Sequence, residues 1–306
     1  MTLSVAELRA GLGFGCVVAG LRGDDLDDES VRAELRRLWV LHGLLIFRGS
    51  PTTPGFQVKL GGCFGVLERH NSASLQVDGH DELIWLTSDS RHQPIYSVAG
   101  EAVVGWFPWH SDTIWRTEVL RGGLLSARTL PARGGDTGFQ CRIQSYERLP
   151  AALKREIAGV EIVYKLSENI ADHPYTLAED VVRIAIPPAI AEMGRLMAAM
   201  APPVAHALVG RQHETGRDYL NFSPMGARHV VGFGDAAAHA LLTRLARHVC
   251  DEGAGYRHRW QPGDLLLWDN WRMNHRAYGT PLGEKRALRR ATIGSDVRQG
   301  RVLDVD

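Results

Sequence analysis

The sequence contains few cysteines, and none of them belong to a local cysteine motif. Only four occur among 306 residues, and no two form a CxxC pair: Cys16, Cys63, Cys141 and Cys250. This spacing argues against a structural zinc site and against a dense disulfide framework. We therefore expect reduced thiols, most of them buried.

An excess of one charge sign is also missing. Lys and Arg together number 35, and so do Asp and Glu, which leaves the formal net charge at zero. No long run of like charge is present that would attract nucleic acid or an anionic membrane. We expect the partner to be a small molecule and not a nucleic acid.

Long apolar runs are absent as well. No stretch reaches the roughly 18 apolar residues that a membrane span needs, and residues 1–9 lack a basic segment followed by an apolar one. We expect a soluble, cytoplasmic protein with no membrane partner. The sequence leaves open whether it forms a homo-oligomer.

Several segments have the periodicity of amphipathic helices. Residues 29–41 place apolar side chains at helical spacing between charged ones: Val31, Leu35, Leu38 and Leu41. Residues 236–249 carry a second stripe: Leu241, Leu242, Leu245 and Val249. We also expect a helix over residues 146–157 and one in the Ala-rich stretch 197–207, ending in a turn.

The remaining sequence is rich in Gly and Pro and breaks into short apolar runs. We expect strands at residues 43–48, 124–127, 160–166, 230–233 and 265–268. Many short strands with irregular connections favour a mainly β jelly roll with flanking helices over a βαβ array. Length alone would allow about two domains, but β folds often exceed 200 residues as one unit, so we expect a single domain over residues 1–306 with helical insertions.

A histidine and an aspartate stand two residues apart in Trp109-His110-Ser111-Asp112. On an extended strand, side chains at i and i+2 point to the same face, so His110 and Asp112 can reach one ion together. Two histidines and one carboxylate leave open positions that suit Fe(II) oxygen chemistry. The spacing is weak evidence alone, because 13 histidines are present and His80-Asp81-Glu82 repeats it.

The segment from Gly263 to Thr292 offers the third ligand, His275. It is interpreted as a strand, a polar bend, a Gly/Pro turn at residues 279–283 and a returning strand. On such a hairpin His275 and Arg286 can lie close together. Arg286, Arg290 and Thr292 are separated by even numbers and so share one face of the returning strand.

An arginine that faces into a barrel needs an anion, and its planar fork matches a carboxylate. A keto acid would supply that carboxylate. Thr137, which follows Gly134-Gly135-Asp136, adds a hydroxyl that could bind the same group. Of the adjacent pair Arg289 and Arg290, we expect Arg290 to face inward and Arg289 to be solvated.

The sequence here resembles the taurine dioxygenase / 2,4-dichlorophenoxyacetate dioxygenase (TauD/TfdA-like) family of Fe(II)/2-oxoglutarate enzymes, over nearly the whole chain. Thr137 is 27 residues after His110, Arg286 is 11 after His275, and Arg290 is 15 after it. The segments that carry the resemblance are His110 to Trp115, Gly134 to Thr137, His213 to Arg217 with Val230 to Phe233, and Trp268 to Thr292.

The resemblance implies a double-stranded β-helix and a reaction with Fe(II), 2-oxoglutarate and O2. It implies that His110, Asp112 and His275 bind iron and that Thr137 and Arg286 hold the distal carboxylate of 2-oxoglutarate. On the substrate side the resemblance further implies Arg290, close to the co-substrate and facing an anionic substrate group, with His70 and Met225. The aromatic cluster around Trp106 is more often core than substrate contact, and Trp106 is a further candidate contact. The implied outcome is hydroxylation of a small, anionic substrate, with release of succinate and CO2.

The sequence departs from the family pattern at two places. A pair of prolines is missing after Trp115, and Trp271 stands between Asp269-Asn270 and Arg272. These departures put in doubt the substrate-side loop and the support of His275. Asp112 argues against a halogenase, because related halogenases have a small residue there.

Alternatives remain open. Desaturation and oxidative cleavage would use the same residues. A zinc hydrolase could use two histidines and one carboxylate with a metal-bound water. A non-catalytic jelly-roll binding protein would need no keto acid, and it would leave Thr137 and Arg286 unexplained.

Overall fold

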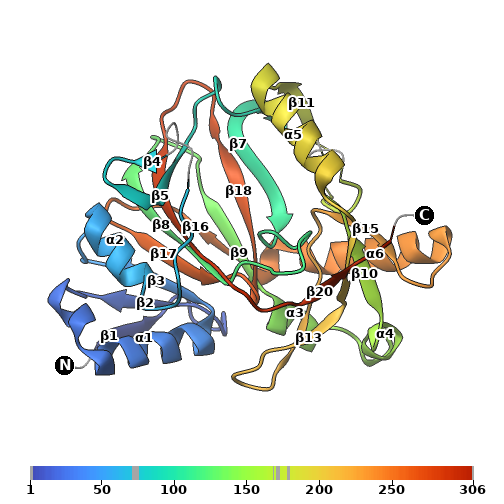
Figure 1. Cartoon of the computed structure of the whole chain (residues 1–306), viewed down its shortest axis with the longest axis horizontal. Coiled ribbons are helices and arrows are strands. Elements are labelled where there is room, and N and C mark those ends of the chain that lie inside the picture. Colours follow the sequence, from blue (N-terminus) through green and yellow to red (C-terminus); the bar gives the residue numbers. More distant parts are fainter. Residues whose placement is uncertain (1–2, 71–75, 168, 170–172, 178–179, 305–306) are drawn as a thin grey trace.

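Two large β-sheets form the centre of the molecule, as the computed structural model shows (Figure 1). It describes residues 3–70, 76–167, 169, 173–177 and 180–304. The larger sheet has eight strands, in the order β1 (Ser4–Glu7), β2 (Cys16–Ala19), β3 (Leu44–Arg48), β17 (Leu265–Asp269), β8 (Gly122–Thr129), β19 (Ala287–Ile293), β5 (His80–Thr87) and β4 (Gln76–Val77). Neighbours are antiparallel except β2 and β3.

The second large sheet is antiparallel and has six strands. Their order is β11 (Val181–Ala185), β6 (Ile95–Val98), β7 (Glu101–His110), β18 (Met273–Pro281), β9 (Thr137–Cys141) and β16 (Tyr256–His258). Many connections return to distant strands, so the chain is a jelly roll, as the sequence predicted. Strands β7 and β18 pair with each other although they lie about 170 residues apart in the chain. A local sequence pattern could not reveal this pairing.

Smaller sheets extend the fold on one side. One has the order β15 (Ala227–Val230), β10 (Glu161–Tyr164), β12 (Val204–Ala207) and β20 (Gly300–Val302), and the other pairs β13 (Val209–Arg211) with β14 (Asp218–Leu220). Isoleucine, tyrosine and phenylalanine side chains of this part pack in a core separate from that of the eight-stranded sheet.

The helices lie outside the sheets (Figure 1). They are α1 (Glu29–His42), α2 (Pro54–Gly61), α3 (Arg142–Glu147), α4 (Ala151–Ile157), α5 (Pro188–Met200) and α6 (Asp235–Val249), with 3-10 turns at Asp24–Asp27 and Glu252–Ala254. Helices α1 and α2 pack on the eight-stranded sheet, and α6 packs beside β15. None of the described helices is long and apolar enough to cross a membrane.

The predicted helices at residues 29–41 and 236–249 are confirmed. Asp28 begins α1 by accepting a hydrogen bond from the Ser30 N–H, and Gly43 ends it with a φ of 72°, a conformation that suits glycine. The stripe of α6 is entirely buried. Leu41 differs from the expectation, because it is 47% exposed at the end of α1.

Two other helix predictions were partly wrong. The segment 146–157 is split between α3 and α4, because Pro150 disfavours helical backbone at the residue before it. The segment 197–207 holds only the end of α5, and Val204–Ala207 forms strand β12 after the two prolines. At residues 230–233 the strand ends at Val230.

The predicted hairpin of the C-terminal segment is also wrong. Strand β18 pairs with β7 and β9, whereas β19 pairs with β5 and β8, so the two strands belong to different sheets. The turn after Pro281 crosses from one sheet to the other. His275 and Arg286 therefore approach one cavity from opposite walls.

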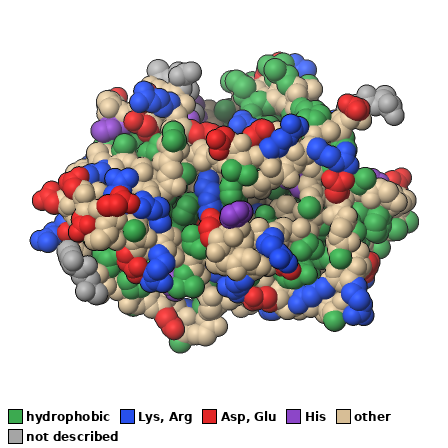
Figure 2. Space-filling view, turned by 60° about the horizontal axis from the view of Figure 1, so that its bottom comes forward, with side chains coloured by type: hydrophobic (Ala, Val, Ile, Leu, Met, Phe, Trp, Pro, Cys, Tyr) green, Lys and Arg blue, Asp and Glu red, His purple; other side chains and the backbone are tan. Residues whose placement is uncertain are grey.

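The state of the cysteines and the distribution of surface charge are as expected from the sequence. All four cysteines are free thiols, and Cys250 is the one that is not fully buried. Acidic and basic side chains are intermixed over the face that Figure 2 presents.

Candidate metal centre and its cavity

A cavity of about 490 Å³ lies between the two large sheets. Its walls come from strands β7, β9 and β18 on one side and β5, β8, β17 and β19 on the other, and α5 adds a further wall. Predicted site residues from distant parts of the sequence meet here: His110, Asp112, Thr137, His275, Arg286 and Arg290.

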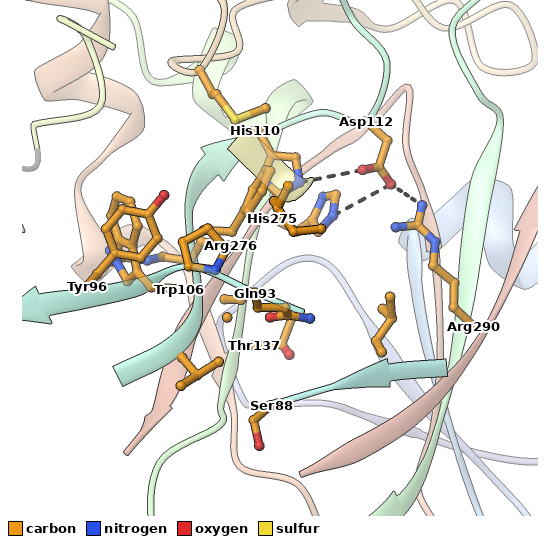
Figure 3. A pocket seen from close by; sticks show the side chains of 18 of the residues that line it. Ser88, Gln93, Tyr96, Trp106, His110, Asp112, Thr137, His275, Arg276 and Arg290 are labelled. Atoms are coloured by element: carbon orange, nitrogen blue, oxygen red, sulfur yellow. Dashed lines mark hydrogen bonds and ion pairs between the residues drawn. The ribbon is translucent and has the colours of Figure 1, made fainter. Parts of the chain in front are cut away.

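His110 and His275 are direct neighbours on paired strands β7 and β18. Their ring centroids are 4.0 Å apart. One Asp112 oxygen lies 3.5 Å from His110 Nε2 and the other lies 3.7 Å from His275 Nε2, as the dashed lines in Figure 3 mark. Ligand atoms of the three residues all lie within 4.8 Å of one another, and they form the one such group among the described residues.

The predicted reason for the closeness of His110 and Asp112 was wrong. Strand β7 ends at His110, and Asp112 lies in the turn that follows, so the two residues do not share a strand face. Thr113 adopts a positive φ of 54°, which is uncommon for a residue other than glycine. The turn aims the Asp112 carboxylate back toward the two imidazoles.

The hydrogen bonds and electrostatic surroundings of the three residues suit a metal. His110 Nδ1 donates to the Pro108 carbonyl oxygen at 2.8 Å, which leaves Nε2 unprotonated in the neutral ring. Burial and the neighbouring His110 hold the pKa of His275 well below its usual range, although Asp112 opposes this. Burial would raise the pKa of Asp112, but Arg290 and both histidines together hold it well below its usual range. The Nε2 atoms of the two imidazoles and the ionised Asp112 carboxylate are donors of the kind that bind a divalent ion.

The segment with the inserted Trp271 supports Asp112 and not His275. Asn270 bonds to the backbone of Asp112, and the buried Arg142 donates to the carbonyl oxygens of Asn270 and Trp271. His275 Nδ1 has no hydrogen-bond partner among the described residues. The departure from the family pattern therefore leaves the carboxylate ligand firmly held.

Arg286 is a cation in the cavity, and Asp136, the acid that acts on it, forms its ion pair with Arg257, at 2.7 Å. The Arg286 guanidinium forms no ion pair among the described residues, and its Nε is buried with no hydrogen-bond partner. Burial lowers the pKa of Arg286 to about 10, although Asp136 opposes this, so the side chain stays charged near neutral pH. Thr137 also lines the cavity, and its Oγ1 accepts a hydrogen bond from Trp260 Nε1 at 3.1 Å. A carboxylate of a keto acid fits this end of the cavity.

Arg290 and Arg289 point to opposite faces of β19, as expected. Arg290 lines the cavity, and its Nη2 lies 2.5 Å from Asp112 Oδ2. The expected solvation of Arg289 is wrong, because this side chain is only 4% exposed and donates to the Thr52 carbonyl oxygen. Helix α2 packs on β19 and covers that face.

Most, but not all, of the predicted substrate residues lie at the cavity. Trp106 and Met225 line it, together with Phe107 and Trp115. His70 is not among the lining residues, and its backbone N–H bonds to the Asp81 carbonyl oxygen in a neighbouring segment.

Several lining residues were not predicted from the sequence. Polar ones are Ser88, Gln93, Tyr96, His173 and Arg276, some of which are labelled in Figure 3. Helix α5 contributes Ile190, Gly194 and Met197, which are spaced by four and three residues and so share one helix face. That spacing was present in the sequence, but nothing local showed which side of the helix faces a cavity.

A jelly roll that holds two histidines and one carboxylate at the end of a cavity defines the class of mononuclear non-haem metal oxygenases. Comparison with known proteins names the group. The family described as "Taurine catabolism dioxygenase TauD, TfdA family" matches residues 5–292, and the chain belongs to that family.

Curated relatives support this membership. The chain is 31% identical over 288 residues to an alpha-ketoglutarate-dependent 2,4-dichlorophenoxyacetate dioxygenase of Cupriavidus pinatubonensis, covering 91% of this chain and 94% of the relative. It is 27% identical to a (S)-phenoxypropionate/alpha-ketoglutarate-dioxygenase of Sphingobium herbicidovorans, covering 92% of each. The enzyme is a 2-oxoglutarate-dependent dioxygenase that uses Fe(II), 2-oxoglutarate and O2.

Solved structures share the fold. A taurine dioxygenase from Burkholderia xenovorans superposes with a TM-score of 0.73 at 23% identity, covering 99% of this chain and 95% of the other. The protein AAD-2, solved with Mn(II) and N-oxalylglycine, has a TM-score of 0.73 at 22% identity, covering 98% and 100%.

Proposed function

We propose that this dioxygenase couples the oxidative decarboxylation of 2-oxoglutarate, giving succinate and CO2, to hydroxylation of a small anionic organic molecule. The observation that carries the proposal is the cavity itself, which has a two-histidine-one-carboxylate group on one wall and the unpaired cation Arg286 on the other. This arrangement matches a co-substrate with a metal-chelating end and a carboxylate end. Neither a zinc hydrolase nor a binding protein needs the second feature.

We assign separate roles to the residues that line the cavity. His110, Asp112 and His275 bind the iron, while Arg286 and Thr137 hold the distal carboxylate of 2-oxoglutarate. The iron and 2-oxoglutarate supply the oxidising chemistry when bound, and the protein positions the reacting bond and excludes water. Residues 1–306 act as one catalytic unit in this proposal.

The cavity favours a substrate with an apolar body and an anionic group. The relatives are named for phenoxyacetate and phenoxypropionate compounds, which have this character. Trp106 and Met225 would contact the apolar body. Arg290, which already pairs with Asp112, retains an Nε without a hydrogen-bond partner and would meet the anion. The assignment of His70 stays a prediction, without support from the cavity lining.

The test is turnover of the loaded protein in the absence of an organic substrate. Fe(II) and 2-oxoglutarate added without O2 should give a weak visible charge-transfer band, and admission of O2 should then produce succinate. The His110→Ala and Asp112→Ala variants should lose both signals. His248→Gln, on α6 and not among the residues that line the cavity, should keep both.

The absence of succinate formation by folded, iron-loaded wild-type protein would contradict the proposal. Zn(II)-loaded protein should give no succinate, and activity with Zn(II) that needs no O2 would favour a hydrolase. Product analysis then separates hydroxylation from desaturation and from oxidative cleavage.

A further inference from the structure

Trp260 contacts both residues to which we assign the distal carboxylate of 2-oxoglutarate. Thr137 and Arg286 line the metal cavity, whereas Trp260 is not among the lining residues. The indole Nε1 donates to Thr137 Oγ1 at 3.1 Å. The Arg286 guanidinium lies over the indole ring, 5.9 Å from its centroid. One side chain outside the cavity thus joins two that line it, and no role for it was expected from the sequence.

Strand pairing brings Trp260 to Thr137. Strand β16 pairs with β9, and His258 on β16 is the register partner of Thr137, the first residue of β9. Trp260 follows two residues later, just after β16 has ended. The side chain of Thr137 is labelled in Figure 3. Because the hydrogen bond joins residues 123 positions apart, no local pattern indicated it.

Other contacts hold Trp260 in place independently of Thr137. Its ring packs edge-on against that of His258, with the centroids 4.9 Å apart and the planes at 88°. His258 is fully buried, and its Nε2 lies 3.0 Å from Asp264 Oδ2. Asp264 also accepts a hydrogen bond from the N–H of Gln261, the residue after Trp260, at 3.0 Å. The position of the indole therefore does not depend on the hydroxyl that it contacts.

The direction of this hydrogen bond determines what the Thr137 hydroxyl can do. An indole N–H only donates, whereas a threonine hydroxyl has one hydrogen to donate and lone pairs that accept. The hydroxyl accepts from Trp260, and it donates no hydrogen bond among the residues that the structure describes. Its hydrogen therefore remains for a carboxylate, which only accepts. Each bond in such a chain also polarises the next, so the N–H makes the hydroxyl a stronger donor.

The indole ring also suits the guanidinium of Arg286. The face of a tryptophan attracts a guanidinium that lies within about 6 Å of the ring centroid. Arg286 packs closely on Gly135 as well, where a Cβ atom would lie 2.9 Å from Arg286 Cδ. Neither contact neutralises the guanidinium. The cation is thus restrained and still able to pair with an anion.

We propose that Trp260 is a positioning residue for 2-oxoglutarate. Its N–H leaves the Thr137 hydroxyl hydrogen directed at the distal carboxylate, and its ring restrains Arg286. This inference rests on the proposed function, in which Thr137 and Arg286 bind that carboxylate. The alternative role of Trp260 is packing alone, because its ring also borders the core that contains Phe139 and Trp268.

The experiment is a double-mutant cycle on the affinity for 2-oxoglutarate, measured by calorimetry on Fe(II)-loaded protein without O2. Trp260→Phe removes the N–H and keeps an aromatic ring beside Arg286. It should weaken binding about 2–10-fold, the size of effect that one hydrogen bond has. In a Thr137→Val background the same change should cause no further weakening, because the hydroxyl that the N–H orients is gone.

The matched control is Trp85→Phe. Trp85 is also half-buried, it does not line the cavity, and the Arg289 guanidinium lies over its ring at 6.0 Å. This variant should bind 2-oxoglutarate as wild type does. In Trp260→Phe the KM for 2-oxoglutarate should rise while kcat changes less than twofold, a split that general loosening of the fold would not give. Thermal unfolding shows that each variant is folded, and Thr137→Ala replaces Thr137→Val if the latter does not fold.

Two outcomes overturn the proposal. One is that Trp260→Phe binds 2-oxoglutarate as tightly as wild type. The other is that Trp260→Phe weakens binding equally with Thr137 and with Val at that position, which would leave packing as the role of the indole.

The same variants keep this inference apart from the proposed function. If Thr137→Val weakens binding and Trp260→Phe does not, the inference alone is overturned. If Thr137→Val binds 2-oxoglutarate as tightly as wild type, the role of Thr137 in the proposed function is overturned, and the inference with it. If the two changes are coupled but O2 yields no succinate, the proposed function alone is overturned.

Discussion

The side-chain amide of Asn270 is bonded to both backbone polar groups of Asp112. Its Nδ2 donates to the Asp112 carbonyl oxygen at 3.0 Å, and its Oδ1 accepts the Asp112 N–H at 2.8 Å. The same Nδ2 also donates to the Leu120 carbonyl oxygen at 2.9 Å. Because Asp112 lies beyond the end of β7, no strand ladder holds it, and Asn270 takes the place of a strand neighbour.

Removing this amide should weaken metal binding. We expect Asn270→Ala to lower the affinity for Mn(II) or Co(II) about 10–100-fold, since residues that orient a metal ligand have effects of this size. The measurement is a metal titration of the metal-free protein, with the unfolding midpoint recorded beside it. A variant that folds and binds metal as tightly as wild type would show that the amide does not position Asp112.

Arg286 should control the affinity for 2-oxoglutarate. A charge-assisted hydrogen bond to a carboxylate contributes about 1.5–3 kcal/mol, so Arg286→Ala should raise the KM for 2-oxoglutarate about 10–150-fold. Succinate formation at saturating 2-oxoglutarate should change far less. The matched control is Arg289→Ala, on the opposite face of β19. An unchanged KM in Arg286→Ala would mean that another cation binds the co-substrate.

The KM for 2-oxoglutarate should also rise at alkaline pH, because Arg286 then loses its charge. Burial lowers the pKa of Arg286 to about 10, so the cation is present below that pH and is lost as the pH rises through it. We therefore expect a constant KM from pH 7 to about 9 and a rising KM toward pH 10 and above. Bound 2-oxoglutarate favours the charged form, so kcat should hold to higher pH than kcat/KM. A KM that stays constant through this range would contradict the effect of burial on Arg286.

Substitutions of the adjacent residues Arg290 and Arg289 test whether Arg290 contacts the anionic group of the substrate. Arg290→Gln should lower kcat/KM at least tenfold for the first organic acid found to stimulate succinate formation, because the anion loses a cation in the cavity. Arg289→Gln should leave that value unchanged and lower the unfolding free energy by about 1–3 kcal/mol, through loss of a buried hydrogen bond. Equal kinetic effects of the two changes would argue against a direct contact with Arg290.

Much of the candidate site could be predicted, because its residues stand at recognisable spacings. His110, Asp112, Thr137, His275, Arg286 and Arg290 all line one cavity. The position of His70 could not be predicted, because its distance from the cavity depends on how the segment before β5 packs. The cavity face of α5 was missed for a similar reason, since all sides of that helix carry apolar residues.

The elements with local signals follow from the amino-acid sequence alone. The apolar stripes of α1 and α6, the equal charge and the spacing of the ligand residues needed no knowledge of distant contacts. Which strands are neighbours depends on the tertiary fold. It placed β18 and β19 in different sheets, so that His275 and Arg286 face each other across a cavity and are not side by side on a hairpin. It also buried Arg289 under α2. Strand pairing and burial of this kind depend on contacts between residues far apart in the chain, which no local pattern records.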